Sequence, residues 1–213
     1  MSCFSFYKVN AAYCDFLRDA DPCVPYTMDQ KSARPFVGIV FSVNGFQYYA
    51  PLTSPKPKHL NMKNQVDFMK VNRGTWGAIN FNNMIPVVPE CVEKVDMRIT
   101  SSDSKADRDY KNLLSNQLSW CNSHRTRILK QAEKLHAMIV QGKAWPTLVK
   151  RCCDFRMDEE RCKEYVHQNL QHEVSASVRR SKVSVRETLA AASRACSDRH
   201  AHLQGTKKDK QSR

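Results

Sequence analysis

Residues 36–52 read FVGIVFSVNGFQYYAPL, which is two runs rich in β-branched and aromatic residues on either side of Asn44-Gly45. Asn-Gly between such runs is the strongest short signal for a β-hairpin, because a two-residue type I′ turn needs a positive φ at both positions. The stretch therefore predicts a strand over residues 36–43, a tight turn, and a second strand over residues 46–52. An antiparallel sheet is expected around this hairpin.

Shorter segments on both sides of the hairpin predict the rest of the sheet and two helices. Their apolar or alternating composition is typical of short strands. We expect these strands over residues 4–9, 77–81, 84–88 and 92–97. Residues 11–19 predict a short helix with Asn10 as its N-cap, and residues 62–71 predict a second helix.

The second half of the chain has helical periodicity. Residues at alternating steps of four and three form one stripe, which predicts either a long helix or two consecutive helices ending near Gly142. The stripe comprises Leu114, Leu118, Cys121, Arg125, Ile128, Ala132, Leu135 and Ile139. Because strands dominate the first half and helices the second, the predicted class is α+β, with an antiparallel sheet covered on one side by helices.

Charge indicates the class of partner. The chain has 34 Lys and Arg against 21 Asp and Glu, a net charge of +13, and a pI of about 9.4. A domain this basic usually meets a polyanion, of which nucleic acid is the first choice. Between residues 31 and 73 the basic side chains face only one carboxylate, Asp67, and aromatic residues are interleaved with them. This combination favours single-stranded RNA, although we expect Phe36, Phe41 and Phe46 to be core residues.

Beyond about residue 150 the periodic pattern weakens. Residues 156–170 and 183–196 can form charged helices, and the end of the chain is basic. We divide the chain into a main domain of residues 1–150, a helical extension of residues 151–200 and a disordered basic tail of residues 201–213. The tail either increases the affinity for RNA or only keeps the chain end soluble, and both interpretations stay open.

Several classes of protein are disfavoured. No window approaches the roughly 20 apolar residues of a membrane span, and residues 1–9 lack the pattern of a secretory signal. We therefore expect a cytoplasmic protein. The nine cysteines are irregularly spaced, which fits reduced thiols better than a disulfide framework. A zinc site is conceivable but not expected, because the paired Cys-x-x-Cys spacing is missing. Its ligands would be Cys152, Cys153, Cys162, His167 and His172.

The run PLTSPKPKH at residues 51–59 follows the second hairpin strand and is the main candidate site. It places the hydroxyls of Thr53 and Ser54, the ammonium groups of Lys56 and Lys58 and the imidazole of His59 close together. The three prolines favour a stiff loop or strand end rather than a helix. Such a group can hold a phosphodiester and move its protons, although a proline-rich turn with solvated lysines is an equally good interpretation of this segment alone.

Several short stretches, in this order along the chain, resemble the ToxN/AbiQ family of endoribonuclease toxins from type III toxin–antitoxin systems. The resemblance runs from the region of Tyr7 to about Trp145. It rests on Phe36-Val37-Gly38-Ile39-Val40, Asn44-Gly45, Ala50-Pro51-Leu52-Thr53-Ser54-Pro55-Lys56, His59, Ile79-Asn80, Met84-Ile85-Pro86 and Gln141-Gly142-Lys143.

The resemblance implies a strongly twisted antiparallel sheet similar to the MazF/Kid toxins and a metal-independent endoribonuclease without cofactors. Its implied partners are substrate mRNA and a small repeated antitoxin RNA that folds as a pseudoknot, in ring-like protein–RNA assemblies with a role in phage defence.

The family's site residues can be placed on matching positions. The resemblance assigns catalysis to Thr53, Ser54 and Lys56. It assigns RNA binding to Tyr13, Tyr26, Arg34 and His59, and the basic stretch of residues 31–73 adds Lys58 and Lys63 as expected RNA contacts. Arg34 stands where relatives often have lysine. The positive charge is kept, but the compact ammonium group of lysine is replaced by a planar guanidinium group.

The chemistry expected at these residues uses the ribose 2′-OH as nucleophile and gives a 2′,3′-cyclic phosphate. Lys56 and Arg34 would stabilise the phosphorane, and Thr53 and Ser54 would donate hydrogen bonds or relay protons. A serine hydrolase or an NTPase is disfavoured, since neither a triad nor a Gly-rich phosphate loop is present. A non-catalytic RNA-binding protein is the alternative function, and a DNA-binding regulator is weaker for lack of a helix-turn-helix pair.

Overall fold

The computed structural model describes residues 3–26 and 35–171 of the 213-residue chain. It divides into two compact units, Met1–Val166 and His167–Arg213. In the second unit only residues 167–171 are described, and they are helical.

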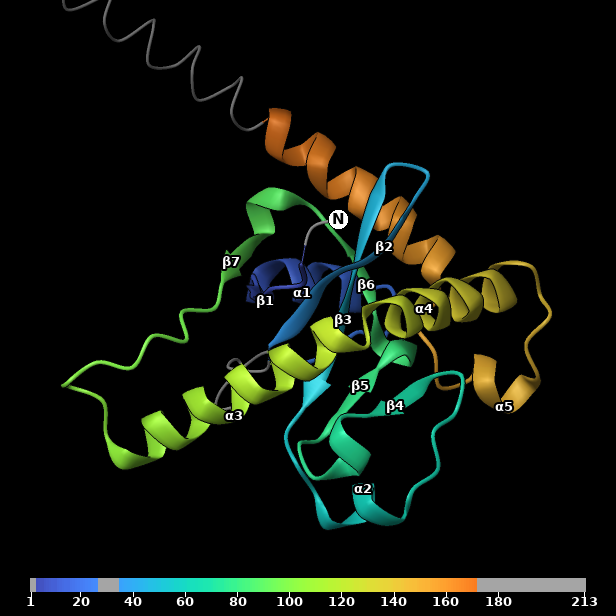
Figure 1. Ribbon diagram of the computed structural model, residues 1–213. Coiled ribbons are helices and arrows are strands. Elements are labelled where there is room, and N and C mark those ends of the chain that lie inside the picture. Colours follow the sequence, from blue (N-terminus) through green and yellow to red (C-terminus); the bar gives the residue numbers. More distant parts are fainter. Residues whose placement is uncertain (1–2, 27–34, 172–213) are drawn as a thin grey trace, which may run out of the picture. The chain divides into compact units, whose positions relative to one another are not determined.

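The first unit is built on an antiparallel sheet (Figure 1). Its strand order is β4-β5-β3-β2-β1-β7, and β6 also pairs with β3. The strands are β1 Phe6–Val9, β2 Phe36–Val43, β3 Phe46–Thr53, β4 Phe68–Lys70, β5 Ala78–Asn80, β6 Ile85–Val87 and β7 Val92–Lys94. Short 3₁₀ turns lie at Asn72–Gly74, Phe81–Asn83 and Pro89–Cys91. The antiparallel sheet and each strand predicted from the sequence are confirmed, with small differences at the ends.

The hairpin of β2 and β3 forms as predicted. Val43 pairs with Phe46, and the turn residues Asn44 and Gly45 have φ values of 49° and 85°. Both values lie in the left-handed region that a type I′ turn requires. β3 is central because it pairs with β2, β5 and β6, so the sheet fixes the position where β3 ends, at Thr53.

The helices of this unit are α1 Ala11–Arg18, α2 Pro57–Asn61, α3 Lys105–Ser123, α4 Arg125–Val140 and α5 Pro146–Val149, followed by a helix that begins at residue 155. α1 has the predicted N-cap, since Asn10 Oδ1 accepts hydrogen bonds from the backbone N–H groups of Ala12 and Tyr13 at 2.8 and 3.3 Å. The predicted helical stripe belongs to two helices, because α3 ends at Ser123 and Arg125 begins α4. None of the described helices combines the length and the apolar composition that crossing a membrane requires.

α4 packs against the sheet and lies in front of the strands in the view of Figure 1. Ile128, Ala132 and Leu135 of its apolar face are fully buried. The ring of His136 contacts those of Phe41 and Tyr48, each at a centroid distance of 5.1 Å. The stripe therefore forms one side of the core, as the periodicity predicted.

Residues 57–71 differ from the sequence prediction. No helix spans residues 62–71. Instead, Gln65 and Phe68 exchange backbone hydrogen bonds in a tight turn, and the chain continues into β4, which pairs with β5. The short helix α2 starts at Pro57, within the segment expected to be a loop. Proline favours the first position of a helix, because its fixed φ suits the helix and its missing N–H is not needed there.

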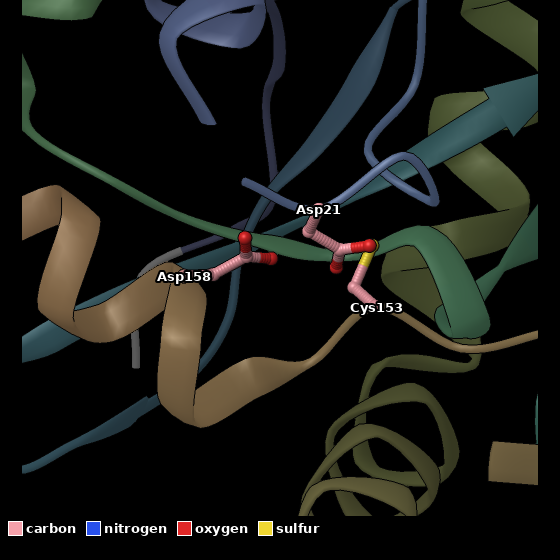
Figure 2. A group of neighbouring side chains, drawn as sticks. All are labelled: Asp21, Cys153 and Asp158. Carbon is pink, nitrogen blue, oxygen red and sulfur yellow. The ribbon is translucent and has the colours of Figure 1, made fainter. Parts of the chain in front are cut away.

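The cysteines of the described residues are free, and most are buried. Cys152, Cys153 and Cys162 are core residues. His167 belongs to the second unit, and His172 lies outside the described residues. Cys153 lies beside Asp21 and Asp158 (Figure 2). Asp21 is far from Cys153 in the sequence, and Asp158 is on the helix that follows it. The nine-cysteine chain thus contains no disulfide among the residues described.

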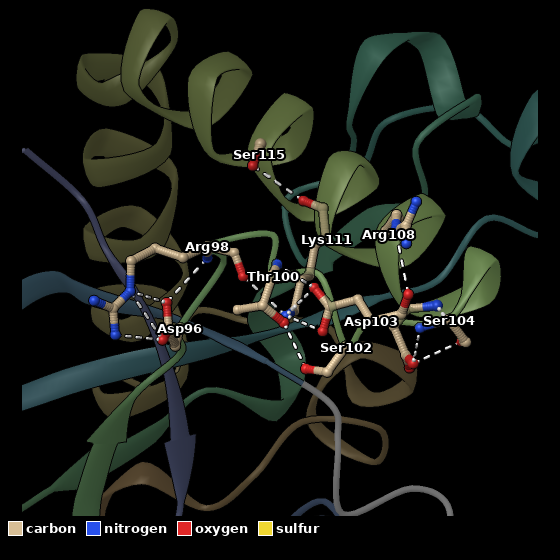
Figure 3. A network of polar contacts seen from close by, with 10 residues as sticks. Asp96, Arg98, Thr100, Ser102, Asp103, Ser104, Arg108, Lys111 and Ser115 are labelled. Atoms are coloured by element: carbon tan, nitrogen blue, oxygen red, sulfur yellow. Dashed lines mark hydrogen bonds and ion pairs between the residues drawn. The ribbon is translucent and has the colours of Figure 1, made fainter.

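Polar contacts fix the start of α3 (Figure 3). The hydroxyl of Ser104 accepts a hydrogen bond from the backbone N–H of Asp107, and the Asp107 carboxylate accepts one from the backbone N–H of Ser104. This reciprocal pair is a capping box. Lys111 Nζ forms an ion pair with Asp103 at 2.7 Å and donates to the carbonyl of Arg98 at 2.9 Å. The segment after β7 is thereby attached to the first turns of α3.

Candidate active site

The segment that joins β3 to α2 forms one wall of a pocket of about 410 Å³. Thr53 is the last residue of β3, Lys56 is the N-cap of α2, and His59 lies within α2. The short helix turns the chain back, so that residues predicted to lie along a loop converge on one cavity. The lining residues are Thr53, Lys56, Lys58, His59, Met62, Gln65, Asp67, Phe68, Asn80, Asn82 and Arg151.

Thr53 is held by the sheet. It pairs with Ala78 of β5, and its Oγ1 donates a hydrogen bond to the carbonyl of Ala78 at 3.2 Å. The side chain is 8% exposed. Gly77 has a φ of +94°, and a Cβ there would overlap the carbonyl oxygen of Thr53. Because the hydroxyl proton is already used, Thr53 offers lone pairs to the pocket rather than the hydrogen bond that the sequence analysis expected.

Lys56 and Lys58 supply the positive charge of this wall. Both are exposed, and neither forms an ion pair with any residue that the structure describes. Their ammonium groups are therefore available to an anion in the pocket. Two unpaired cations at one mouth favour a phosphate, which can accept several charge-assisted hydrogen bonds.

His59 is a buried titratable group of the pocket, with 3% of its surface exposed. Its Nδ1 has no hydrogen-bond partner among the described residues. Burial lowers the pKa of His59, and the positive charges of Lys58 and Lys56 lower that pKa further. The imidazole is therefore neutral at pH 7 and can accept a proton.

Arg151 and Asp67 also line the pocket. Arg151 Nε and Nη2 donate to the two carboxylate oxygens of Asp67 at 2.6 and 3.1 Å, and Nη2 also donates to Gln65 Oε1 at 2.9 Å. This bidentate hydrogen bonding raises the pKa of Arg151. Asn82 Nδ2 donates to the carbonyl of Arg151 at 3.0 Å, which joins Arg151 to the turn after β5. The carboxylate of Asp67 is thus neutralised and does not repel an anion.

The other residues expected at the site lie elsewhere or at its margin. Ser54 and Lys63 are exposed and do not line the pocket. Tyr26 is 46% exposed, and its ring lies 4.8 Å from the guanidinium carbon of Arg18. Arg34 lies outside the described residues.

Tyr13 corrects an expectation. Its ring is fully buried, and its hydroxyl donates to the carbonyl of Pro86 at 2.7 Å. Burial raises the pKa of Tyr13 far above its ordinary value. A ring in this position packs in the core and cannot stack on a base, so the structure does not support its assignment as an RNA contact. The apolar face of α1 turns inward at this residue, which explains the difference.

The sequence analysis missed Gln65, Asp67, Asn82 and Arg151 as site residues. Arg151 and Asp67 are 84 positions apart, and isolated polar residues of this kind carry no motif. Asp67 offered one signal, since it is the single carboxylate in the basic stretch of residues 31–73. A lone acid among many bases is a candidate for an ion pair that shapes a site.

A second hollow of about 700 Å³ borders the pocket and shares Gln65 with it. Its cations, Arg127, Lys130 and Lys134, are spaced three and four residues apart on α4 and therefore lie on one helix face. We call this hollow the α4 groove. Its lining residues are Asn64, Gln65, Val66, Thr126, Arg127, Lys130, Gln131 and Lys134. Gln131 Nε2 donates to the carbonyl of Gln65 at 2.7 Å, which holds α4 against the turn before β4.

Known proteins are similar to this chain in sequence and fold. The family model for the ToxN toxin of type III toxin–antitoxin systems matches residues 5–163. The chain is 33% identical over 166 residues to the endoribonuclease ToxN of Bacillus thuringiensis subsp. kurstaki, covering 75% of this chain and 83% of that protein. The match to the family model extends beyond residue 145, where the resemblance found in the sequence ended, and it includes Arg151.

Two solved structures resemble the first unit. One, a bacterial type III toxin that a non-coding RNA pseudoknot inhibits, has a TM-score of 0.63 and 31% identity, and covers 77% of this chain and 98% of its own. AbiQ, a lactococcal anti-phage endoribonuclease of the type III class, has a TM-score of 0.66 and 22% identity, and covers 78% of this chain and 99% of its own. At that identity the likeness to AbiQ concerns the fold.

Proposed function

The chain belongs to the ToxN family of type III toxin–antitoxin toxins, and from this premise we propose that it is an endoribonuclease that cleaves single-stranded RNA. The observation that carries the proposal is the pocket itself. A neutral His59, the unpaired ammonium groups of Lys56 and Lys58, and the fixed hydroxyl of Thr53 meet in one cavity of about 410 Å³. These groups can accept a proton and stabilise negative charge at a single phosphodiester.

The proposed reaction is an attack of the ribose 2′-OH on the adjacent phosphorus, without a metal ion. The imidazole of His59 accepts the 2′-OH proton, and Lys56 and Lys58 stabilise the charge on the phosphorane. Thr53 accepts a hydrogen bond from a base N–H of the bound strand and so helps to position the substrate. Lys56 supplies the proton that the 5′-oxygen needs when the P–O5′ bond breaks. The products are a 2′,3′-cyclic phosphate and a 5′-hydroxyl. Ser54, at the exposed rim, contacts the backbone of the bound strand.

The α4 groove supports an extended RNA path. It begins at Gln65, where the pocket ends, and three cations of α4 line it. Phosphates of a bound strand can therefore continue from the cleavage site onto α4, with Lys63 and Tyr26 as outer contacts. We propose that substrate mRNA and a small repeated pseudoknot RNA, the antitoxin, compete for this path in the cytoplasm. Growth arrest, phage defence and a ring-like protein–RNA assembly remain parts of the same proposal.

The deciding experiment separates cleavage from binding. Lys56→Ala should lower the rate of RNA cleavage on the order of 100-fold or more, because a charge-stabilising donor and the leaving-group acid are lost together. RNA affinity should fall only slightly. Lys94→Ala, at an exposed position of β7, is the matched control and should cleave normally. An intact chain that binds RNA and cuts none would instead favour the alternative function, a non-catalytic RNA-binding protein.

The mechanism has its own test. Cleavage in short assays should persist in EDTA, and a substrate with 2′-deoxyribose at the cut position should resist, because no nucleophile remains. The product ends should be a cyclic phosphate and a 5′-hydroxyl. Dependence on a divalent ion in these assays, or cutting of the deoxy substrate, would overturn the 2′-OH route.

A further inference from the structure

A buried group of ligand atoms lies apart from the residues that carry the proposed chemistry. Asp21 follows α1, Cys153 precedes the helix that begins at residue 155, and Asp158 lies in its first turn. One carboxylate oxygen of each aspartate and the Cys153 Sγ lie within 4.8 Å of one another. Figure 2 shows the Asp21 carboxylate next to the Cys153 sulfur, with the Asp158 carboxylate on the other side of Asp21. All three are buried, at 5%, 1% and 0% exposure.

Asp158 is the anomaly in this group. It is fully buried, and neither of its carboxylate oxygens has a hydrogen-bond partner among the described residues. Asp21 faces it with a second carboxylate, and no described Lys, Arg or His forms an ion pair with either. Burying an unpaired carboxylate is costly, and a second acid beside it increases the cost. The site therefore needs either a proton on Asp158 or a positive charge beside it.

The other two ligands are oriented by the backbone. The two carboxylate oxygens of Asp21 accept hydrogen bonds from the N–H groups of Cys23 and Asp154, at 2.8 and 2.7 Å. The N–H of Cys153 donates to the carbonyl of Asn82 at 2.8 Å. Each carboxylate oxygen of Asp21 keeps a lone pair. Hydrogen bonds of this kind commonly orient metal-ligating carboxylates in proteins.

We propose that Asp21, Cys153 and Asp158 bind a structural divalent cation, with Zn²⁺ as the best match. Zn²⁺ accepts both thiolate and carboxylate ligands in a tetrahedral arrangement, in which three protein ligands leave a fourth position open, whereas Mg²⁺ and Ca²⁺ prefer oxygen alone. Water completes the coordination. The ion joins the segment after α1 to the segment of residues 153–158. Arg151, which lines the candidate active-site pocket, is two residues from Cys153 in the sequence. The ion therefore stiffens the lining of that pocket without taking part in cleavage.

The test uses the full-length chain with Lys56→Ala, which allows production in growing cells. The protein is stripped with a chelator and titrated with Zn²⁺ alone. We expect one equivalent to bind, and a rise in Tm of roughly 5–10 °C when free Zn²⁺ is 100 times Kd. Co²⁺ in place of Zn²⁺ should produce a thiolate-to-cobalt absorption band in the near ultraviolet.

Three variants in the same background assign the ligands. Asp158→Asn and Cys153→Ser should each weaken Zn²⁺ binding at least tenfold, and Cys153→Ser should remove the cobalt band. Cys152→Ser changes a neighbouring buried thiol outside the group and should keep both. Asp158→Asn also controls for folding, because an amide lacks the buried charge and its metal-free Tm should equal or exceed that of the parent.

Two results would overturn the proposal. One is a parent chain that takes up no stoichiometric Zn²⁺, which would mean that a proton alone neutralises Asp158. The other is Zn²⁺ binding that survives Asp158→Asn and Cys153→Ser, or that Cys152→Ser abolishes, which would place the ion on other thiols. Neither result depends on RNA cleavage, so the proposed function is tested separately.

Discussion

The protonation state of His59 depends on its immediate neighbours. Burial and the charges of Lys58 and Lys56 hold its pKa below the ordinary histidine value of 6.5. Of the other charged residues at the pocket, Asp67 is paired with Arg151 and so contributes little net charge. The group best placed to accept a proton is therefore ready to do so at neutral pH, and the lysines that bind phosphate also keep it unprotonated.

This arrangement predicts a pH profile. A base acts when unprotonated, so kcat/KM for RNA cleavage should rise with pH through the lowered pKa of His59 and then level off. Lys58→Gln removes a positive neighbour, which raises that pKa and moves the acidic limb to higher pH. Lys58→Arg keeps the charge and should leave the limb in place. An acidic limb that is the same in Lys58→Gln and the parent would show that another group is the base.

At the scale of elements, the sequence predicted what is local and periodic. The hairpin followed from Asn44-Gly45, and α4 from the spacing of Ile128, Ala132 and Leu135. It failed over residues 57–71, because Pro57 can start a helix as well as prevent one, and because the turn at Gln65 depends on contacts with α4. These are tertiary contacts, which composition does not encode.

The site was predictable to the same extent. Thr53, Lys56 and His59 are close in sequence. They were therefore expected to lie near one another, and they line the same pocket although the sequence did not predict α2. Asp67 and Arg151 meet across 84 residues, and only the fold brings them together. Tyr13 was misplaced because an aromatic residue on a short amphipathic helix suits a groove or a core, and the sequence does not say which face turns inward. The likeness of the sheet to MazF/Kid toxins stays a prediction.

The contact between β5 and β3 yields a second prediction. Gly77 lies against the carbonyl of Thr53 at a φ of +94°, so Gly77→Ala should cost about 2 kcal/mol or more through strain and overlap, and should slow cleavage by displacing Thr53. Gly142→Ala is the control, since its φ is +66° with nothing within 4 Å of an added Cβ. It should cost about 1–2 kcal/mol through the left-handed φ alone, less than Gly77→Ala, and should cleave normally. Denaturant unfolding and a cleavage assay measure the stability and the activity of both variants. Equal losses of stability and activity in the two variants would contradict a special role for the contact with Thr53.

For the whole molecule, the position of the charge matters more than its sum. The net charge is +13, but the α4 groove places three cations directly beside the pocket. A strand that leaves the cleavage site meets α4 next. Binding along this path should release counterions in proportion to the phosphates contacted, which makes affinity depend steeply on salt.

Charge reversal tests the path. Lys130→Glu should weaken RNA binding and flatten the log–log salt dependence of Kd by about one unit for each lost phosphate contact. Lys94→Glu changes the net charge equally at an exposed position of β7, outside both hollows. It should leave the slope nearly unchanged. Equal effects of the two variants would mean that RNA senses only the overall charge.

The late position of Arg151 in the sequence has a consequence for the timing of toxicity. A nascent chain has Lys56 and His59 early in translation, but it lacks Arg151 and the buried residues that follow until most of the protein has been made. We expect chains released before residue 150 to leave cellular RNA intact, and expression of residues 1–145 not to arrest growth; arrest would show that these residues are dispensable. A ribosome that is synthesising the toxin would then carry a harmless chain, and an inhibitor already present could meet each molecule as it becomes active.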